Sequence, residues 1–255
     1  MKVFEEYAGY YDALYADKDY AAETEYVLGL LRQQGCAPES LLELGCGTGV
    51  HAQHFAQAQV RVHGVDRSSA MLERACARLR EMPEEIARHI TFSRGDAREI
   101  RLSRMFDCAV SLFHVMSYQT GNDDLQNAFL TARQHLKPGG IFLFDCWYGP
   151  AVLAEKPEVR TKRWSNHEVS ALRIAEPSLH VNENRVDVHY TLRVTCKRSG
   201  VTQEVHEVHS MRYLFRPEVE WFASRAGLQI TEAREWLSQR PPGLNTWNVC
   251  FLARG

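Results

Sequence analysis

The spacing of hydrophobic positions changes along the chain. Between residues 41 and 146, short apolar runs alternate with segments in which apolar residues recur every three or four positions. The runs cover residues 41–44, 60–65, 90–93, 106–112 and 141–146. Strands that alternate with helices in this way form parallel sheets covered by helices, so we expect a Rossmann-like, doubly wound α/β core.

After residue 150 the apolar spacing becomes two. One predicted strand face consists of Val186, Val188, Tyr190, Leu192 and Val194. Together with turn residues at 182–184 and 199–200, this pattern predicts about three antiparallel strands within residues 162–215. A helix over residues 217–226, closed by Gly227, and strands near 228–236 and 246–253 then resume the first pattern.

Because the α/β pattern resumes, the antiparallel segment is an insertion within one domain. We expect N-terminal lid helices in residues 1–35, the core in 36–150, an antiparallel β insertion after strand five in 151–215, and completion of the sheet in 216–255. The completed sheet has seven strands, including a C-terminal antiparallel strand.

Composition and charge exclude several classes of protein. The 255 residues carry 30 Lys and Arg against 32 Asp and Glu, so a basic nucleic-acid-binding surface is not expected. No apolar run reaches the roughly 18 residues of a membrane span, and acids at Glu5 and Glu6 do not fit a signal peptide. Seven scattered cysteines without a CxxC pair indicate reduced thiols. We therefore expect a cytoplasmic monomer or homodimer.

The first predicted strand runs into a glycine loop. Its pattern is acid-x-Gly-x-Gly-x-Gly, with Glu43 followed by Gly45, Gly47 and Gly49. Alternating glycines allow a tight turn and let a ligand approach backbone N–H groups at a helix N-terminus. A dinucleotide fingerprint requires glycine at the sixth position, which is Val50 here, so a nicotinamide oxidoreductase is disfavoured.

Two acids follow the next two predicted strands. Asp66 ends the second strand and is placed to accept hydrogen bonds from ribose hydroxyls, while Asp96 follows the third and could accept from an exocyclic amine. Either acid could instead cap the helix that follows it. The loop, the two acids and their spacing, with Lys-Pro-Gly-Gly at 137–140, resemble class I S-adenosylmethionine-dependent methyltransferases.

The resemblance implies S-adenosyl-L-methionine as the cofactor and S-adenosyl-L-homocysteine as the product. It places Gly45 and Gly47 beside the methionine portion, Asp66 at the ribose, and Asp96 and Ala97 beside adenine. The other cofactor contacts that we expect are Tyr11, Tyr20, Glu43, Cys46, Arg67, Met71, Gly95, Leu112 and Phe113.

The opening of the chain is dense in tyrosine, at positions 7, 10, 11, 15 and 20. This segment looks like the lid of bacterial aminosugar N-methyltransferases, which also insert antiparallel strands after strand five. The resemblance implies a small-molecule acceptor, such as a sugar or nucleotide sugar, methylated on O or N. In that group lid tyrosines close over the cofactor, although tyrosines at this spacing also occur in helices that only pack against the fold.

Candidate catalytic residues follow the fourth predicted strand, where His114 could be a general base or orient the acceptor and Tyr118 could bind it. Both could instead be structural. Acceptor contacts are expected from Tyr15, Trp147, Tyr148, His209 and Arg212. No metal site is expected, because His206 and His209 lie three apart on a strand and so on opposite faces.

Two alternative functions remain open from the sequence. An RNA or protein methyltransferase would need a basic groove, which the net charge of −2 does not favour, and the Asn/Asp-Pro-Pro-aromatic motif of some such enzymes is absent after strand four. A non-catalytic S-adenosylmethionine-binding module would not need polar residues such as His114 and Tyr118 at its cleft.

Overall fold

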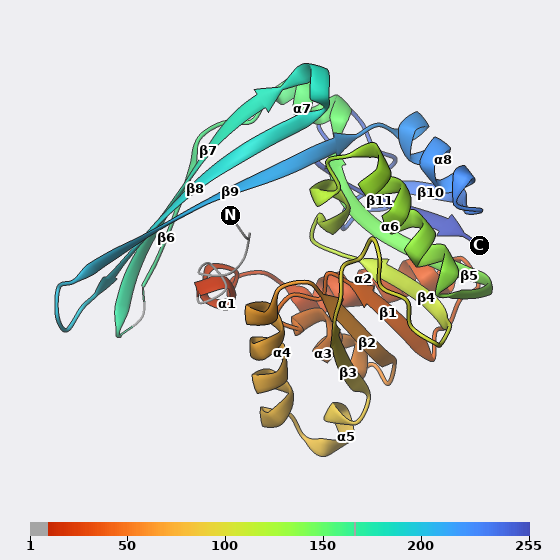
Figure 1. Ribbon diagram of the computed structural model, residues 1–255, viewed down its shortest axis with the longest axis horizontal. Helices are drawn as coiled ribbons and strands as arrows, with labels where there is room; N and C mark the ends of the chain where they lie inside the picture. Colours follow the sequence, from red (N-terminus) through yellow and green to blue (C-terminus); the bar gives the residue numbers. More distant parts are fainter. Residues whose placement is uncertain (1–9, 166) are drawn as a thin grey trace.

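The computed structural model describes residues 10–255 except residue 166, so Tyr7 of the tyrosine-dense opening lies outside the described residues. Its core is a seven-stranded sheet in the order β3-β2-β1-β4-β5-β11-β10 (Figure 1). The first five strands are parallel, and β11 is antiparallel to both of its neighbours. The bounds are β1 Ser40–Leu44, β2 Arg61–Asp66, β3 Ile90–Arg94, β4 Phe106–Ser111, β5 Leu136–Tyr148, β10 Gln229–Glu235 and β11 Asn248–Arg254.

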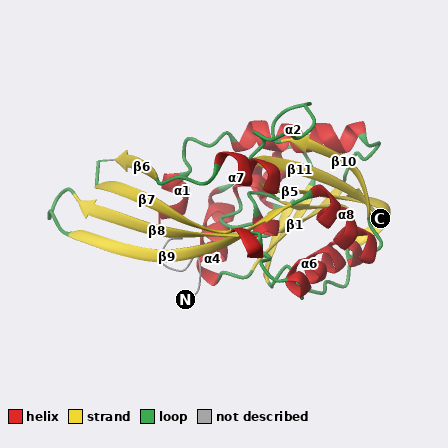
Figure 2. Cartoon of the chain, turned by 90° about the horizontal axis from the view of Figure 1, so that it is seen from above, coloured by secondary structure: helices red, strands yellow, loops and turns green. Residues whose placement is uncertain are grey.

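Helices cover both faces of this sheet, and alternation along the strands divides the core into two layers. In β5, Ile141 and Leu143 pack with α2 (Tyr20–Gln33) and α3 (Val50–Gln57). Phe142 and Phe144 pack instead with α6 (Asn122–Gln134) and α8 (Arg216–Arg225). Figure 2 shows α2 and α6 on opposite sides of the sheet. The helices are α1 Tyr11–Leu14, α2 Tyr20–Gln33, α3 Val50–Gln57, α4 Ser69–Glu81, α5 Glu84–Ala87, α6 Asn122–Gln134, α7 Gly149–Glu155 and α8 Arg216–Arg225, with short 3-10 turns η2 Val115–Tyr118 and η3 Val181–Glu183.

The residues after α7 form an antiparallel sheet that projects from the core, which we call the wing. It consists of β6 Arg160–Ser165, β7 Val169–His180, β8 Arg185–Cys196 and β9 Thr202–Leu214. Its last strand joins the core sheet, where Trp147 and Tyr148 pair with Tyr213 and Leu214. In Figure 1 the wing extends well beyond the helices of the core, with α1 near its inner side.

The wing has four strands rather than about three. The additional strand, β6, forms the edge of the sheet, and four of its six residues are exposed. Because neither face is well buried, its sequence lacks the alternation of apolar and polar residues that reveals β8. The start of β5 also differs, since Leu136 already pairs with Phe106 and the strand begins there rather than at residue 141. Within the described residues, no helix is long and apolar enough to span a membrane.

Candidate active site

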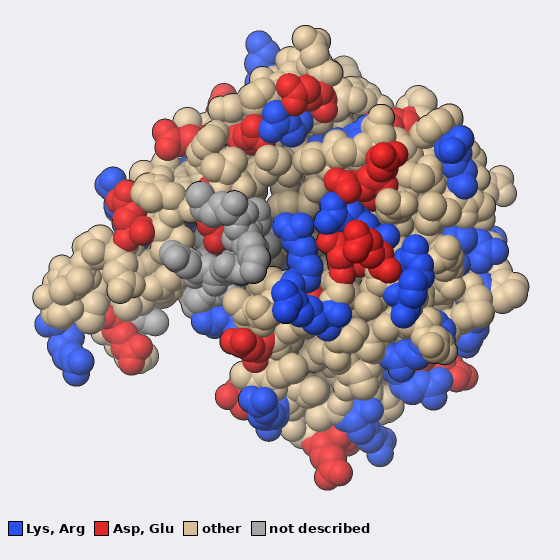
Figure 3. All heavy atoms as spheres, viewed as in Figure 1, with Lys and Arg blue, Asp and Glu red and all other residues tan. Residues whose placement is uncertain are grey.

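A cleft opens where the carboxyl ends of the parallel strands meet the wing and α1. It encloses about 1300 Å³, including space open to solvent. Figure 3 shows a hollow between the wing and the core with acidic and basic side chains beside it. One half of the cleft is lined by the glycine loop and the ends of β2, β3 and β4, and the other by η2, α1 and the inner face of the wing.

The glycine loop forms the floor of the first half. Gly45 has a φ of +79°, and a Cβ there would lie 2.5 Å from a methyl carbon of Val115. Gly47, with a φ of +54°, instead faces open space, because an added Cβ would meet no atom within 4 Å. A side chain at Gly45 therefore has no room, whereas one at Gly47 would project into space that a ligand could use.

Asp66 holds this loop and faces the cleft. One carboxylate oxygen accepts from the backbone N–H of Gly47 at 2.8 Å, and the other accepts from that of Ser68 at 2.9 Å. Burial raises the pKa of Asp66, which these backbone hydrogen bonds partly oppose. Each oxygen keeps a second lone pair, so the carboxylate can also accept from the two hydroxyls of a ribose.

Asp96 lies at the same edge of the sheet and is held by an arginine. Arg98 donates from Nε and Nη2 to the two carboxylate oxygens at 2.8 and 2.6 Å, and it also binds Asp124 at 2.7 Å. Although burial opposes the effect, the hydrogen bonds from Arg98 lower the pKa of Asp96. The acid therefore stays charged and oriented, with Gly95 and Ala97 beside it in the cleft wall.

Glu43 lies beneath the loop and does not line the cleft, which corrects its expected position as a direct cofactor contact. It is 1% exposed, and burial together with the nearby charge of Asp66 raises its pKa well above the ordinary value. A protonated carboxyl is a poor partner for a cationic group of a ligand. On its other side lies His51, whose Nδ1 is 3.8 Å from Oε1 of Glu43.

His51 connects the loop to the N-terminal helices. Its Nε2 lies 2.8 Å from Oε2 of Glu23 on α2, and Tyr20 packs edge-on against its ring. Burial lowers the pKa of His51, so the ring is neutral and donates to the carboxylate. Burial opposes ionisation of Glu23 too, but the His51 hydrogen bond and the charge of Lys18 lower its pKa to about 2.

The fourth strand ends in a strained turn that presents His114. Phe113 and His114 both have a positive φ, of 63° and 64°, which is rare for residues other than glycine. The buried carboxylate of Asp145 on β5 accepts from the backbone N–H of His114 at 3.1 and 3.2 Å. Its Oδ2 also lies 2.7 Å from the imidazole Nδ1, off the angle of a good hydrogen bond. A bare ring nitrogen would repel a carboxylate at this distance, so we assign the ring proton to Nδ1.

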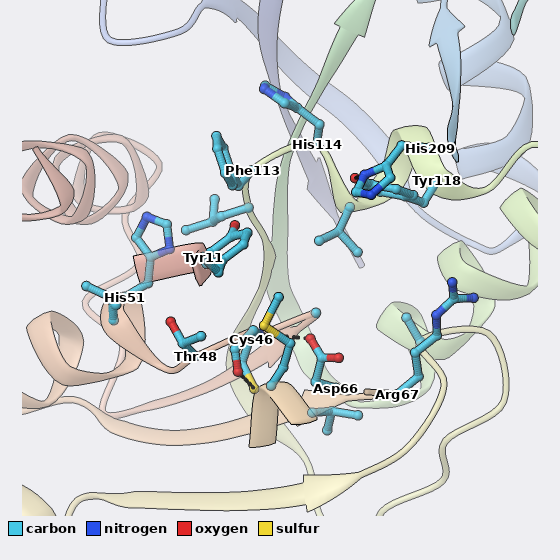
Figure 4. Close-up of a pocket in the computed structure, with 18 of the residues that line it drawn as sticks. Tyr11, Cys46, Thr48, His51, Asp66, Arg67, Phe113, His114, Tyr118 and His209 are labelled. Carbon is cyan, nitrogen blue, oxygen red and sulfur yellow. Dashed lines mark hydrogen bonds between the residues drawn. The ribbon is translucent and has the colours of Figure 1, made fainter. Parts of the chain in front are cut away.

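The second half of the cleft is aromatic and is built from three parts of the chain. Tyr15, which follows α1 as its C-cap, packs edge-on against Phe113, with ring centroids 5.0 Å apart. Trp147 is the next-to-last residue of β5, and Tyr190 and His209 come from β8 and β9 of the wing. Figure 4 shows Tyr118 beside His209 on one side of this space, and Tyr11 between them and His51. Such a surface suits a ring-shaped acceptor that carries a few polar groups.

Most of the expected site residues line this one cleft. They are Tyr11, Tyr15, Tyr20, Gly45, Cys46, Gly47, Asp66, Arg67, Met71, Gly95, Asp96, Ala97, Leu112, Phe113, His114, Tyr118, Trp147 and His209. Eight further lining residues were not predicted: Thr48, Val50, His51, Val65, Val115, Gln119, Tyr190 and Met211. Those next to the glycine loop could have been found from their adjacency to it, whereas Tyr190 and Met211 depend on how the wing folds back.

Tyr148 and Arg212, which we expected at the acceptor, lie outside the lining of the cleft. Successive strand residues point to opposite faces, so Tyr148 turns away from the cleft that its neighbour Trp147 lines and packs against the core. Arg212, three residues after His209 on β9, likewise faces the other side. It binds the backbone carbonyl of Thr120 and the carboxylate of Glu218, and so holds α8 and the turn before α6.

Asp12 on α1 fastens the N-terminal helix to the glycine loop. Thr48 in the loop donates to Oδ1 of Asp12 at 2.6 Å, and Arg78 on α4 donates to Oδ2 at 2.7 Å. Arg78 also donates to the backbone carbonyl of Thr48 at 3.1 Å. The position of α1 at the cleft and the shape of the loop are therefore coupled through one carboxylate.

Replacing Asp12 with alanine is expected to weaken, about tenfold, binding of the S-adenosylmethionine that the sequence predicts, because α1 loses one charge-assisted hydrogen bond from the loop and one from Arg78 on α4. Isothermal titration calorimetry measures the change. Asp17→Ala is the matched control, since its bond to Lys162 is exposed and does not involve the loop. Equal affinities for Asp12→Ala and Asp17→Ala would contradict the coupling.

Comparison with known proteins gives consistent similarities. Residues 41–140 match the family model of a methyltransferase domain. One similar protein is dTDP-3-amino-3,4,6-trideoxy-alpha-D-glucopyranose N,N-dimethyltransferase of Streptomyces venezuelae, which is 30% identical to this chain over 246 residues. The match covers 93% of this chain and 94% of that protein. It superposes on the crystal structure of DesVI from Streptomyces venezuelae with a TM-score of 0.80, at 26% identity and 97% coverage of both chains. The S-adenosylmethionine-bound structure of CalS10, an amino pentose methyltransferase from Micromonospora echinaspora, superposes with a TM-score of 0.76 at 22% sequence identity. The superposition covers 100% of this chain and 98% of CalS10.

Proposed function

Because the chain belongs to the S-adenosylmethionine-dependent methyltransferases that act on small molecules, we propose that it methylates the amino group of a nucleotide-linked deoxysugar, in two successive transfers. One observation carries this proposal. The similarity to the sugar N,N-dimethyltransferase of Streptomyces venezuelae covers 93% of the chain. It thus includes the wing and most of the second, aromatic half of the cleft.

The residues of the first half of the cleft fit the cofactor. Gly47 leaves room beside the loop, the carboxylate of Asp66 can accept from ribose hydroxyls, and Asp96 is held charged next to Ala97 for the adenine amine. When bound, S-adenosylmethionine supplies a methyl group on a sulfonium, and the new N–C bond forms as the S–C bond breaks with its electron pair staying on sulfur. The protein contributes alignment and removal of a proton.

The second half of the cleft is assigned to the acceptor. Tyr15, Trp147 and Tyr190 offer aromatic surface to a sugar ring, and the polar ends of His114 and Tyr118 are available to its amino and hydroxyl groups. With its proton on Nδ1, the imidazole of His114 presents Nε2 as a hydrogen-bond acceptor. We assign His114 the role of orienting the acceptor in line with the methyl group.

The proposal is tested by incubating the protein with S-adenosylmethionine and a set of dTDP-linked hexoses that carry an amine at C3 or C4. Mass spectrometry should show singly and then doubly methylated product from at least one of them. The matched control is the same sugar nucleotide with a hydroxyl in place of the amine, which should give none. Methylation of the hydroxyl sugar alone, or of no sugar nucleotide while another small molecule is methylated, would overturn the assignment of an amine acceptor.

A further inference from the structure

Three polar side chains lie end to end between the turn after β4 and the inner face of the wing. The hydroxyl of Tyr118 is 2.8 Å from Nδ1 of His209, and Nε2 of His209 is 2.9 Å from Oε2 of Glu207. His209 is 3% exposed and Glu207 is 4% exposed. Figure 4 shows the rings of Tyr118 and His209 next to each other at the cleft. The series therefore begins at the cleft and ends in a buried carboxylate.

The arrangement of these three side chains follows from strand β9 of the wing. Glu207, His209 and Met211 alternate along β9 and share its inner face, whereas Tyr118 comes from η2. Tyr118 and His209 line the cleft, and Glu207 lies behind them. A carboxylate can only accept, so Nε2 of His209 donates to Glu207 and Nδ1 accepts from the hydroxyl of Tyr118. This is the arrangement in which a hydroxyl at the cleft can pass its proton inward.

We propose that Tyr118, His209 and Glu207 take up the proton that the acceptor amine must lose before methylation. The inference rests on the proposed function, because an amine that arrives as an ammonium ion must lose a proton before its nitrogen can attack the methyl group. One N–H proton of the ammonium passes to the oxygen of Tyr118 while the O–H proton of Tyr118 passes to Nδ1 of His209. The amine regains its lone pair, and the positive charge moves to an imidazolium that faces Glu207.

Each methyl transfer leaves a methylammonium, so a second transfer needs the same step again. The proton held on His209 returns through the Tyr118 oxygen to water in the solvent-open part of the cleft, which resets the relay. His209 and Glu207 act through Tyr118 and are positioning residues, whereas Tyr118 is the group that touches the acceptor. His114, held by Asp145, is left to orient the acceptor.

Other ionisable groups around His209 come from three elements. The ring of Tyr190 on β8 packs edge-on against that of His209, with centroids 4.8 Å apart, and the guanidinium carbon of Arg173 on β7 lies 5.3 Å from the centroid of the Tyr190 ring. Arg173 also donates to the hydroxyl of Tyr15, the C-cap residue of α1, at 3.0 Å. Glu207 is thus the carboxylate in hydrogen-bond contact with His209, and the cation of Arg173 contacts the neighbouring rings of Tyr190 and Tyr15.

The test compares the pH dependence of turnover in Tyr118→Phe and Glu207→Gln with that of the wild-type protein, using the amino sugar nucleotide identified above. Near pH 7 both variants should turn over about tenfold more slowly, because the ammonium form has lost its proton acceptor. The deficit should shrink as the pH rises to the range in which the amine is already neutral. Affinity for S-adenosylmethionine, measured by calorimetry, should stay unchanged in both.

His206→Asn is the matched control, because His206 lies on the exposed outer face of the same strand. It should behave as wild type at every pH. A rate deficit in Tyr118→Phe or Glu207→Gln that is equal at all pH values would assign these residues a structural role and overturn the relay. Full activity of either variant at pH 7 would also overturn it.

Two further measurements separate this inference from its premise. Nitrogen-15 NMR of His209 should find the ring proton on Nε2 in the free protein, and a proton on Nδ1 would contradict the relay whatever the acceptor is. If the wild-type protein methylates only a hydroxyl, the amine assignment fails. The relay fails separately if Tyr118→Phe then transfers to that hydroxyl at the wild-type rate.

Discussion

Asp66→Ala is expected to weaken S-adenosylmethionine binding on the order of 100-fold, because two hydrogen bonds from ribose to a charged acceptor are lost. The same change leaves the backbone N–H groups of Gly47 and Ser68 without their carboxylate, so the glycine loop loses the contact that shapes it. Calorimetric titration of the purified variant measures the affinity. A circular dichroism spectrum and a melting curve show whether the fold is retained.

The control for this change is Glu73→Gln, which removes a carboxylate from an exposed position on the helix that follows Asp66. It should bind as tightly as the wild-type protein. Burial raises the pKa of Asp66 above its ordinary value of 3.8, so this carboxylate becomes protonated at a higher pH than an exposed aspartate. The affinity of the wild-type protein for S-adenosylmethionine should therefore start to fall at that higher pH on acidification. Unchanged affinity in Asp66→Ala would remove the residue from the cofactor site.

Much of the cofactor half of the cleft could be predicted because each part is local. Gly45 and Gly47 follow a strand directly, and Asp66 and Asp96 end the next two strands. In a parallel sheet these strand ends meet at one edge whatever the rest of the fold does. Glu43 shows the limit of that reasoning. It is only two residues before Gly45, yet its side chain lies beneath the loop while Gly45 lines the cleft.

The acceptor half could be predicted only in part, because it is assembled from segments that are distant in sequence. The apolar face of β8 is a single pattern in sequence, yet the structure divides it. Val186 and Val188 pack beside Tyr213, Leu192 and Val194 pack against Leu14 of α1, and Tyr190 between them lines the cleft. The alternation of apolar residues predicts which face of the strand a residue lies on, but it does not predict which other element packs against that residue.

The relay of Tyr118 with the wing illustrates the same limit. Tyr118 and His209 were both expected at the site, but their hydrogen bond joins residues 91 positions apart and depends on the register between β8 and β9. Glu207 has no sequence signature, because an acid on a strand is usually solvated. Its burial beside His209 follows only once the wing packs over the turn after β4.

Asp145→Asn should lower turnover on the order of 100-fold with little change in S-adenosylmethionine affinity. The carboxylate now faces Nδ1 of His114 at 2.7 Å and keeps the proton there, which leaves Nε2 as an acceptor for the substrate. An asparagine can still accept from the backbone N–H of His114 through its carbonyl oxygen, so the turn at Phe113 and His114 is retained. Its amide group then donates toward Nδ1, the proton moves to Nε2, and the acceptor meets a donor where it needs an acceptor.

Turnover under saturating cofactor, together with calorimetric affinity, distinguishes this effect from loss of binding. Glu220→Gln removes an exposed carboxylate on α8, well separated from the cleft lining, and serves as the control with wild-type turnover expected. His114→Ala should be about as slow as Asp145→Asn, and the double variant should be no slower than either, because both changes remove one oriented imidazole. Additive losses would mean that Asp145 acts independently of His114. Wild-type turnover in Asp145→Asn would show that the tautomer of His114 has no part in the reaction. Orientation of the acceptor would then no longer explain the strained turn at Phe113 and His114.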